Sequence, residues 1–104
     1  ETSEPVGAVD LFDFDPFHLR AGTGILIGDQ KERKQGLASE ALDLLIEYGS
    51  KVLLLKQLYC NILEDNKESI ALFMKKGFRI TGEKSAWIKT SEGWKNEYFL
   101  QLLF

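Results

Sequence analysis

The sequence predicts a single domain of the mixed α/β (α+β) class, with a largely antiparallel sheet and helices packed against it. Its 104 residues, 44% of them hydrophobic, suffice for one hydrophobic core. Two segments with helical periodicity lie between shorter segments that alternate or run continuously apolar. Tight-turn residues join the remaining strands. The predicted order is therefore β-β-α-β-α-β-β over residues 1–104, and the helical connections make the sheet mixed.

The first half of the chain predicts two strands and a helix. Residues 6–14 partly alternate and predict a strand that ends at Asp15 and Pro16, whereas residues 23–28 form an apolar run typical of a strand covered on both faces. A polar segment, DQKERKQG, then predicts a loop before a helix over residues 36–50. One apolar stripe marks that helix, formed by Leu37, Ala38, Ala41, Leu42, Leu45 and Gly49.

The second half predicts a strand, a helix and further strands. Residues 57–63 alternate and predict a strand. Asp65 and Glu68 have the spacing of a capping box at a helix start, and Gly77 suits the helix end. The predicted buried face of this helix consists of Ile70, Phe73 and Met74.

The last segments predict extended structure. Residues 78–82 are expected to be extended and residues 85–89 to continue as a strand, and Ser91, Glu92 and Gly93 give a turn signal. The final strand is expected over residues 97–104, where Tyr98, Leu100, Leu102 and Phe104 fall on one side.

The amino-acid composition limits which partners and which cellular compartment we expect for the protein. A single cysteine, Cys60, excludes an intramolecular disulfide framework and favours a reducing cytoplasm. No uncharged apolar run approaches the roughly 18–20 residues that span a bilayer, and the first residues do not resemble a signal peptide. The net charge of −3 lacks the basic excess of a nucleic-acid binder. We expect a cytoplasmic protein with neither a nucleic-acid nor a membrane partner.

The strand-loop-helix segment over residues 25–41 is the candidate binding element. Free backbone amides at a helix N-terminus, together with its dipole, favour an anion. Gly36 allows close approach to the backbone, and Lys31, Arg33 and Lys34 add positive charge. An exposed basic loop whose glycine eases the start of the helix explains these residues equally well.

Other chemistries find little support in the sequence. Neither the P-loop pattern nor the G-x-G-x-x-G dinucleotide pattern is present. One histidine and one cysteine cannot build the usual zinc set, so we expect no metal. Cys60 and His18 nominally offer a nucleophilic pair, but the alternation predicts that Cys60 is a buried core thiol, and His18 is expected in a loop.

Two motifs about one strand apart can be read together. The first is Arg33-x-x-Gly36-x-Ala38, directly before the predicted helix. The second is Asn66-x-x-Ser69-Ile70-x-Leu72-Phe73-x-Lys75-x-Gly77-Phe78, followed by Gly82. The pair resembles the GNAT N-acetyltransferase superfamily, whose acetyl-CoA motif is similar to the first. The resemblance covers essentially the whole chain and is closest to the subgroup with spermidine and ribosomal-protein N-terminal-alanine acetyltransferases.

The resemblance implies acetyl-CoA as cosubstrate and a set of residues that bind it. The strand edge at residues 25–27 would pair with the pantetheine amides, and the backbone amides of residues 33–38 would hold the pyrophosphate. Asn66 and Ser69 would lie near the pantetheine or nucleotide, although a helix-capping and a packing role suit them equally. The implied cofactor-binding residues are Ile25, Leu26, Ile27, Arg33, Lys34, Gln35, Gly36, Leu37, Ala38, Asn66, Ser69 and Phe73.

The chain departs from the family pattern in two ways. Phe73 stands where the family often has a tyrosine that protonates the departing thiolate, and phenylalanine cannot donate a proton. Family domains also usually begin with a strand, two helices and a second strand, so the domain is expected to be N-terminally incomplete. Residues 6–14 would then form an exposed sheet edge, which favours a homo-oligomer or contact with a separate piece.

The expected function is transfer of an acetyl group from acetyl-CoA to a primary amine of a polyamine, a protein N-terminus or a small molecule. Asp10 and Asp13 could attract a cationic amine, and no general base or acid is identified. Phe73 and the expected missing elements leave an alternative, a non-catalytic acyl-CoA-binding or assembly module. A small α/β domain whose loop binds nothing also stays open.

Overall fold

The residues that the structure describes form a five-stranded sheet and two α-helices. The computed structural model describes the backbone of residues 8–26 and 31–104 and the side chains of residues 10–24 and 38–104. Its elements are β1 (Ala8–Asp15), β2 (Arg20–Leu26), α1 (Lys31–Glu47), the π-helical turn η1 (Tyr48–Val52), β3 (Gln57–Leu63), α2 (Lys67–Lys75), β4 (Arg79–Thr90) and β5 (Gly93–Leu103).

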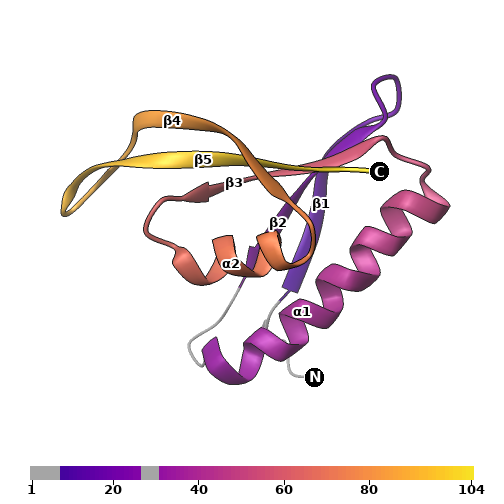
Figure 1. Ribbon diagram of the computed structural model, residues 1–104, viewed down its shortest axis with the longest axis horizontal. Coiled ribbons are helices and arrows are strands. Elements are labelled where there is room, and N and C mark those ends of the chain that lie inside the picture. Colours follow the sequence, from indigo (N-terminus) through magenta and orange to yellow (C-terminus); the bar gives the residue numbers. More distant parts are fainter. Residues whose placement is uncertain (1–7, 27–30) are drawn as a thin grey trace.

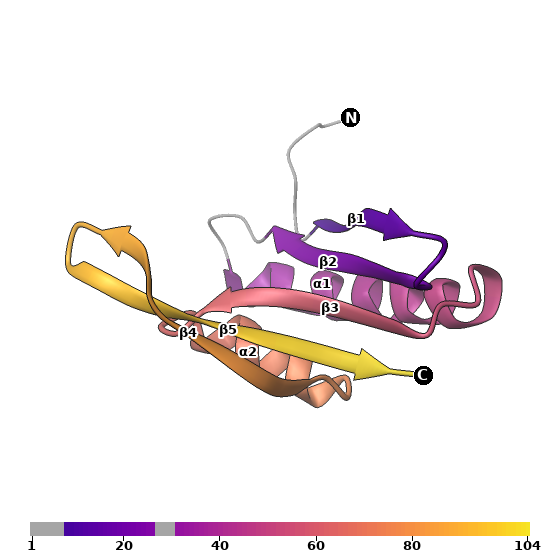
Figure 2. The same cartoon turned by 90° about the horizontal axis from the view of Figure 1, so that it is seen from above.

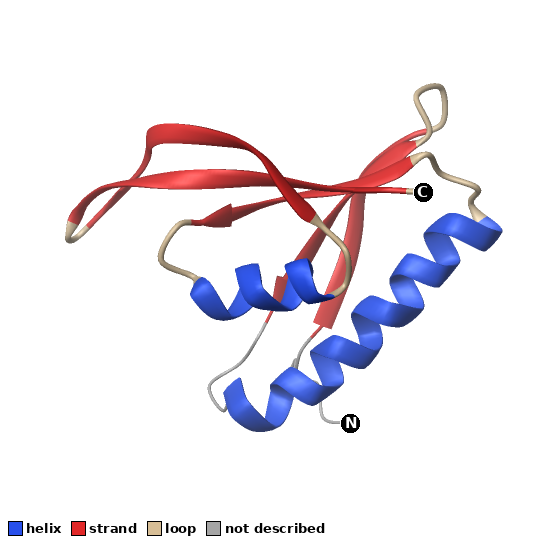
Figure 3. Ribbon diagram, in the orientation of Figure 1, coloured by secondary structure: helices blue, strands red, loops and turns tan. Residues whose placement is uncertain are grey.

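The sheet is mixed and mostly antiparallel, in the strand order β1-β2-β3-β5-β4. The β1–β2, β3–β5 and β4–β5 pairs are antiparallel, and β2 runs parallel to β3. Both helices lie on the same face of the sheet (Figures 1 and 3). We call this the covered face, and the opposite side the open face. The predicted fold class and element order are confirmed.

The core lies between the sheet and the two helices, and β3 shows how the sequence builds it. Leu58, Cys60 and Ile62 alternate along β3 and are buried on the covered face, and the intervening residues face the other way. Two aromatic rings of the core, Phe73 and Phe78, meet edge to face with centroids 5.0 Å apart. The buried hydrophobic cluster comprises Ala21, Leu42, Leu55, Leu58, Cys60, Ile62, Phe73, Phe78 and Leu100.

The parallel seam between β2 and β3 is short. Its register runs over three partners, from Arg20 opposite Gln57 to Gly22 opposite Tyr59. Beyond Gly22 the two strands diverge toward their carboxyl ends, as Figure 2 shows. The seam therefore opens in the middle of the sheet.

The start of α2 differs from the prediction, and its end agrees with it. Its N-cap is Asn66 rather than Asp65, since the Asn66 side-chain oxygen accepts a hydrogen bond of 3.3 Å from the Ser69 N–H. The predicted helix end is confirmed, because Gly77 has φ +107° directly after the last turn. Met74, expected on the buried face, is about half exposed.

Other boundaries differ from the predicted ones. Helix α1 starts at Lys31, so residues predicted as a loop lie in its first turns; Lys, Glu, Arg and Gln are all good helix formers. Strand β2 begins at Arg20, and strand β5 begins at Gly93 rather than at residue 97. The extended segment predicted over 78–82 does continue through 85–89, as the twelve-residue strand β4 with a bulge near Ala86 at φ +49°.

Candidate functional site

A cavity of about 110 Å³ lies where β2 and β3 separate. The first residues beyond the seam, Thr23 on β2 and Cys60 on β3, form part of its wall, and the start of α2 closes one side. The full lining consists of Thr23, Gly24, Cys60, Asn61, Ile62, Leu63, Asn66, Ser69 and Phe73.

The lining residues come from both faces of the sheet. Cys60 and Phe73 belong to the core of the covered face. Asn61 follows Cys60 in the strand and therefore projects from the open face, where its side chain is exposed. A ligand in the cavity would thus contact groups of both faces at one point.

Helix α2 brings together three of the residues implied by the sequence. Asn66, Ser69 and Phe73 follow one another at intervals of three and four, which places them on one side of a helix. Ser69 and Phe73 are buried, and Asn66 is exposed at the cap. All three line the cavity.

The thiol of Cys60 is buried in the cavity wall, and we expect it to be unreactive. Burial raises its pKa from 9.0 to about 12, against a smaller lowering by a hydrogen bond with the Thr23 side chain. A thiol with such a pKa is protonated at neutral pH and is a poor nucleophile. The predicted burial of Cys60 is confirmed.

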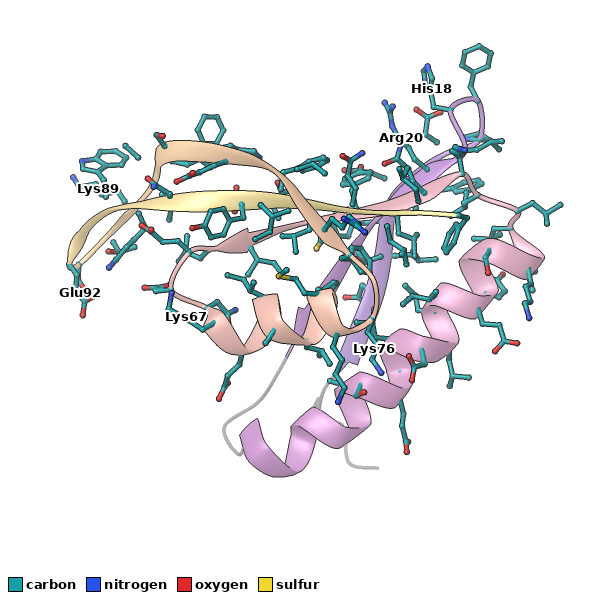
Figure 4. The ribbon with its side chains drawn as sticks, in the orientation of Figure 1. His18, Arg20, Lys67, Lys76, Lys89 and Glu92 are labelled. Atoms are coloured by element: carbon teal, nitrogen blue, oxygen red, sulfur yellow. The ribbon has the colours of Figure 1, made fainter. Side chains whose placement is uncertain are left out.

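The histidine lies in the turn between β1 and β2 (Figure 4), and it is not among the residues that line the cavity with Cys60. His18 Nδ1 is 2.9 Å from Asp15 Oδ2, and the Asp15 Oδ1 accepts hydrogen bonds from the backbone N–H groups of Phe17 and His18. These contacts hold the pKa of Asp15 below its usual 3.8, with the His18 side chain as the main cause. His18 is thus a loop residue, as predicted.

A polar cluster lies on the open face beside the cavity. The Lys84 ammonium is 2.9 Å from Asn61 Oδ1 and 3.5 Å from Glu97 Oε1, and it lies 5.2 Å from the centre of the Trp87 ring. Lys84, Glu97 and Trp87 were not predicted as site residues. The register of β3, β5 and β4 brings these side chains to Asn61, and the spacing of residues along the chain does not reveal that register.

The remaining predicted residues are described to different extents. Ile25 and Leu26 end β2, Ile27 lies outside the described residues, and Ala38 is fully buried on α1. Asp10 is exposed on β1 opposite Gly24. The others lie in the first turns of α1, where the structure describes the backbone but not the side chains: Arg33, Lys34, Gln35, Gly36 and Leu37.

Thr23, Gly24, Ile62 and Leu63 also line the cavity without having been predicted. Their positions at the carboxyl ends of two neighbouring parallel strands are the signal that would have found them. Within the described residues, no cluster of three or more His, Cys, Asp or Glu side chains could hold a metal ion. Across the same part of the chain, no helix has the length and apolar character needed to cross a membrane.

Comparison with known proteins gives matches in sequence and structure. A family model described as "Acetyltransferase (GNAT) domain" matches residues 1–79. Spermidine N(1)-acetyltransferase of Escherichia coli (strain K12) is 36% identical over 80 residues, covering 77% of this chain and 42% of that protein. An N-acetyltransferase 9-like protein of Nematostella vectensis is 31% identical over 103 residues, covering 98% of this chain and 52% of that protein.

A solved structure shares the fold. A dodecameric spermidine N-acetyltransferase from Vibrio cholerae superposes with a TM-score of 0.84 at 19% identity, covering 96% of this chain and 58% of that chain. The chain therefore spans about half the length of the relatives it matches.

Proposed function

The chain belongs to the GNAT acetyltransferase family, and from this we propose that it binds acetyl-CoA where β2 and β3 separate and transfers the acetyl group to a primary amine. The observation that carries the proposal is the cavity at the open end of the seam. Three residues of the family-like motif, Asn66, Ser69 and Phe73, line it together with the ends of both strands.

The diverging strands suit an extended ligand with amide groups. Pairing between β2 and β3 ends at Gly22 and Tyr59, and β2 continues to Leu26. Beyond the last pair, the backbone groups of β2 and β3 that face each other across the opening need other partners, and an extended chain such as pantetheine offers both donors and acceptors. The proposal therefore keeps Ile25, Leu26 and Ile27 as its backbone contacts.

The start of α1 suits the pyrophosphate. The first four N–H groups of a helix have no partner within the helix, and the dipole adds partial positive charge there. Because α1 begins at Lys31, residues 31–33 contribute free amides. Arg33 belongs both to this set and to the motif, so its amide is the strongest candidate among those of residues 33–38.

The reaction needs an amine, a thioester and a route for protons. The lone pair of the neutral amine attacks the thioester carbonyl carbon, the carbonyl electrons move to oxygen, and they return as the C–S bond breaks. The nitrogen loses a proton to water and the thiolate gains one from water, since Phe73 offers no donor. The chain contributes mainly orientation and hydrogen bonds to the carbonyl oxygen.

The open face suits a cationic acceptor at one position. Asp10 pairs in register with Gly24, which lines the cavity, and its side chain is exposed. A carboxylate beside the opening attracts an ammonium group. The acceptor class is thus a primary amine, and a polyamine, a protein N-terminus and a small amine are the members to be compared.

Acyl-CoA binding without turnover is the second candidate, and Phe73 favours it. This ring lines the cavity and is 1% exposed, and it carries no group that could donate a proton to the departing thiolate. Phe73→Tyr is expected to raise turnover if the missing donor limits the rate. Unchanged turnover together with acetyl-CoA binding would favour the binding module.

The first experiment measures the unfolding midpoint with acetyl-CoA and with ATP as control. Acetyl-CoA at about 100 times its dissociation constant should add roughly 2.7 kcal/mol to the free energy of unfolding. Ser69→Leu, which fills the cavity, should abolish this shift, whereas Ser91→Leu in the exposed β4–β5 turn should retain it. Release of free thiol with a panel of amines then tests transfer, and no shift with acetyl-CoA would contradict the proposal.

Self-association through β1 is part of the proposal. Strand β1 lies at the edge of the described sheet, and Phe14 beside the turn is half exposed. Such an edge can pair with a second chain. Sedimentation equilibrium should show a species larger than the monomer, and a monomer at all concentrations would contradict this part.

A further inference from the structure

Lys84 holds the side chain of Asn61 in one orientation beside the cavity. The two residues lie on β4 and β3, with β5 between them. In register, Asn61 is opposite Phe99, and Glu97 is opposite Lys84. Glu97 and Phe99 share a face because they are two apart, so Lys84 reaches across β5 on the open face. The contact is thus built by three strands.

The ammonium is restrained by several groups at once. Its distances are 2.9 Å to Asn61 Oδ1 and 3.5 Å to Glu97 Oε1, and it lies over the Trp87 ring. The side chains of Lys84 and Glu97 are 35% and 17% exposed. A lysine on a solvated face usually samples many rotamers, and these partners reduce that freedom.

The chemistry of lysine fixes which way the carboxamide faces. An ammonium has three donors and no acceptor, so only the oxygen of Asn61 can pair with it. The carboxamide nitrogen is then turned away from β4 and β5. The opposite side of β3 is the side of β2, where the cavity lined by Asn61 lies.

We propose that the Asn61 Nδ2–H group donates a hydrogen bond to the carbonyl oxygen of the acyl group held in the cavity, and that Lys84 is a positioning residue for this donor. The inference rests on the proposed function. As the amine nitrogen bonds to the carbonyl carbon, negative charge collects on that oxygen, and a donor fixed beforehand stabilises it. The charge of Lys84 also polarises the carboxamide and strengthens its N–H donor.

The test compares five variants. Asn61→Ala removes the donor, and Asn61→Asp keeps an oxygen for Lys84 but replaces the N–H group by oxygen. Lys84→Met removes the ammonium, Lys84→Arg retains a cationic donor, and Lys89→Met is the matched control because Lys89 is exposed on the same strand.

Each variant is measured for acetyl-CoA affinity, for turnover at saturating acetyl-CoA and amine, and for the infrared carbonyl stretch of ¹³C-labelled acetyl-CoA. Both Asn61 variants should lower kcat about 100-fold, in the range for loss of one oxyanion donor. Lys84→Met should lower it about tenfold, as for loss of an orienting partner, and Lys84→Arg should restore most of it. Acetyl-CoA affinity should stay within about twofold, because the ground-state carbonyl gains little from the donor.

The carbonyl stretch separates the inference from the function on which it rests. Binding should shift it to lower frequency in the wild type and in Lys89→Met, and less in the Asn61 variants. Equal shifts in wild type and Asn61→Ala overturn the inference while the proposed function stands. A shift that depends on Asn61, without turnover, supports the donor and overturns the proposed transfer. Absence of acetyl-CoA binding in the wild type overturns both.

Discussion

The two faces of the sheet use the same strands for different purposes. On the covered face, Leu58, Cys60 and Leu100 are almost completely buried against the helices. On the open face, Asn61 directly follows Cys60 along β3, and its side chain makes a solvent-accessible hydrogen bond with Lys84 of β4. Because strand residues alternate, a buried position and an exposed polar position can be adjacent in sequence.

The two faces should respond differently to substitution, one in stability and the other in ligand contacts. The covered face supplies the packing that holds α2 against the sheet, and the cavity is the point where both faces contribute side chains. Substitutions that remove packing on the covered face should therefore lower the free energy of unfolding most. Substitutions on the open face should leave the fold intact, cost little stability and alter contacts with a ligand.

The largest expected effect is that of Phe73→Ala. The ring is buried and packs edge to face on Phe78, so its loss leaves a cavity and should lower the free energy of unfolding by about 3–5 kcal/mol. Trp87→Ala on the open face, where the ring is mostly exposed, is the control and should cost less than about 1 kcal/mol. Urea denaturation of both measures the contrast, and equal losses would break it.

The alkylation rate of Cys60 measures how well the covered face excludes solvent. A pKa of about 12 instead of 9.0 leaves roughly a thousandth of the thiolate at a given pH, so alkylation of the native protein should be about a thousand times slower than of the unfolded chain. Iodoacetamide labelling at pH 8, with and without urea, measures both rates. Native rates within tenfold of the unfolded rate would show that the covered face is open to solvent there.

Gly22→Ala tests packing on the open face. A Cβ at this position would meet the Phe12 ring, which lies across the backbone of Gly22. The ring is 42% exposed and can move outward, so the expected loss in free energy of unfolding is only about 1 kcal/mol. The double variant Phe12→Ala/Gly22→Ala should cost less than the sum of the single changes by urea denaturation. Additive losses would show that the two residues do not interact.

The smallest effect belongs to the β1–β2 turn, which is part of neither face. Contacts with His18 lower the pKa of Asp15 in the folded state, so its ionised form adds stability above the ordinary carboxyl pKa of 3.8. That stability is lost as pH falls through the lowered folded pKa. The difference in free energy of unfolding between wild type and Asp15→Asn should be constant above about pH 5 and shrink toward pH 2. A difference that is the same at both pH values would contradict the pairing.

The local sequence pattern was enough to predict the bounds of elements whose residues alternate clearly or that end at a characteristic residue. The strand expected over residues 57–63 has those bounds in β3, because its period of two matches a strand with one buried face. Gly77 marked the end of α2, since few other residues accept its positive φ. Both predictions depended on neighbours in the chain alone.

The structure differs from the prediction where two adjacent residues suit the same role, or where a contact joins residues far apart in the sequence. Asp65 and Asn66 are both good caps, and only the path of the chain after β3 decides which reaches the Ser69 N–H. The first residues of α1 are polar, so no periodic pattern of apolar residues indicated that they are helical. The Lys84–Asn61 contact depends on the register of two strand pairs, so no local spacing encodes it.

The short seam has a consequence for how the molecule opens. Three register pairs and the hydrogen bonds from Lys56 and Gln57 to the Leu19 carbonyl all lie at one end of the β2–β3 junction. The β1–β2 hairpin should therefore swing away as a cooperative unit, and its amide protons should exchange with deuterium before those of β3 and β5. A ligand that bridges the open end would tie the two units together and slow exchange in the hairpin most.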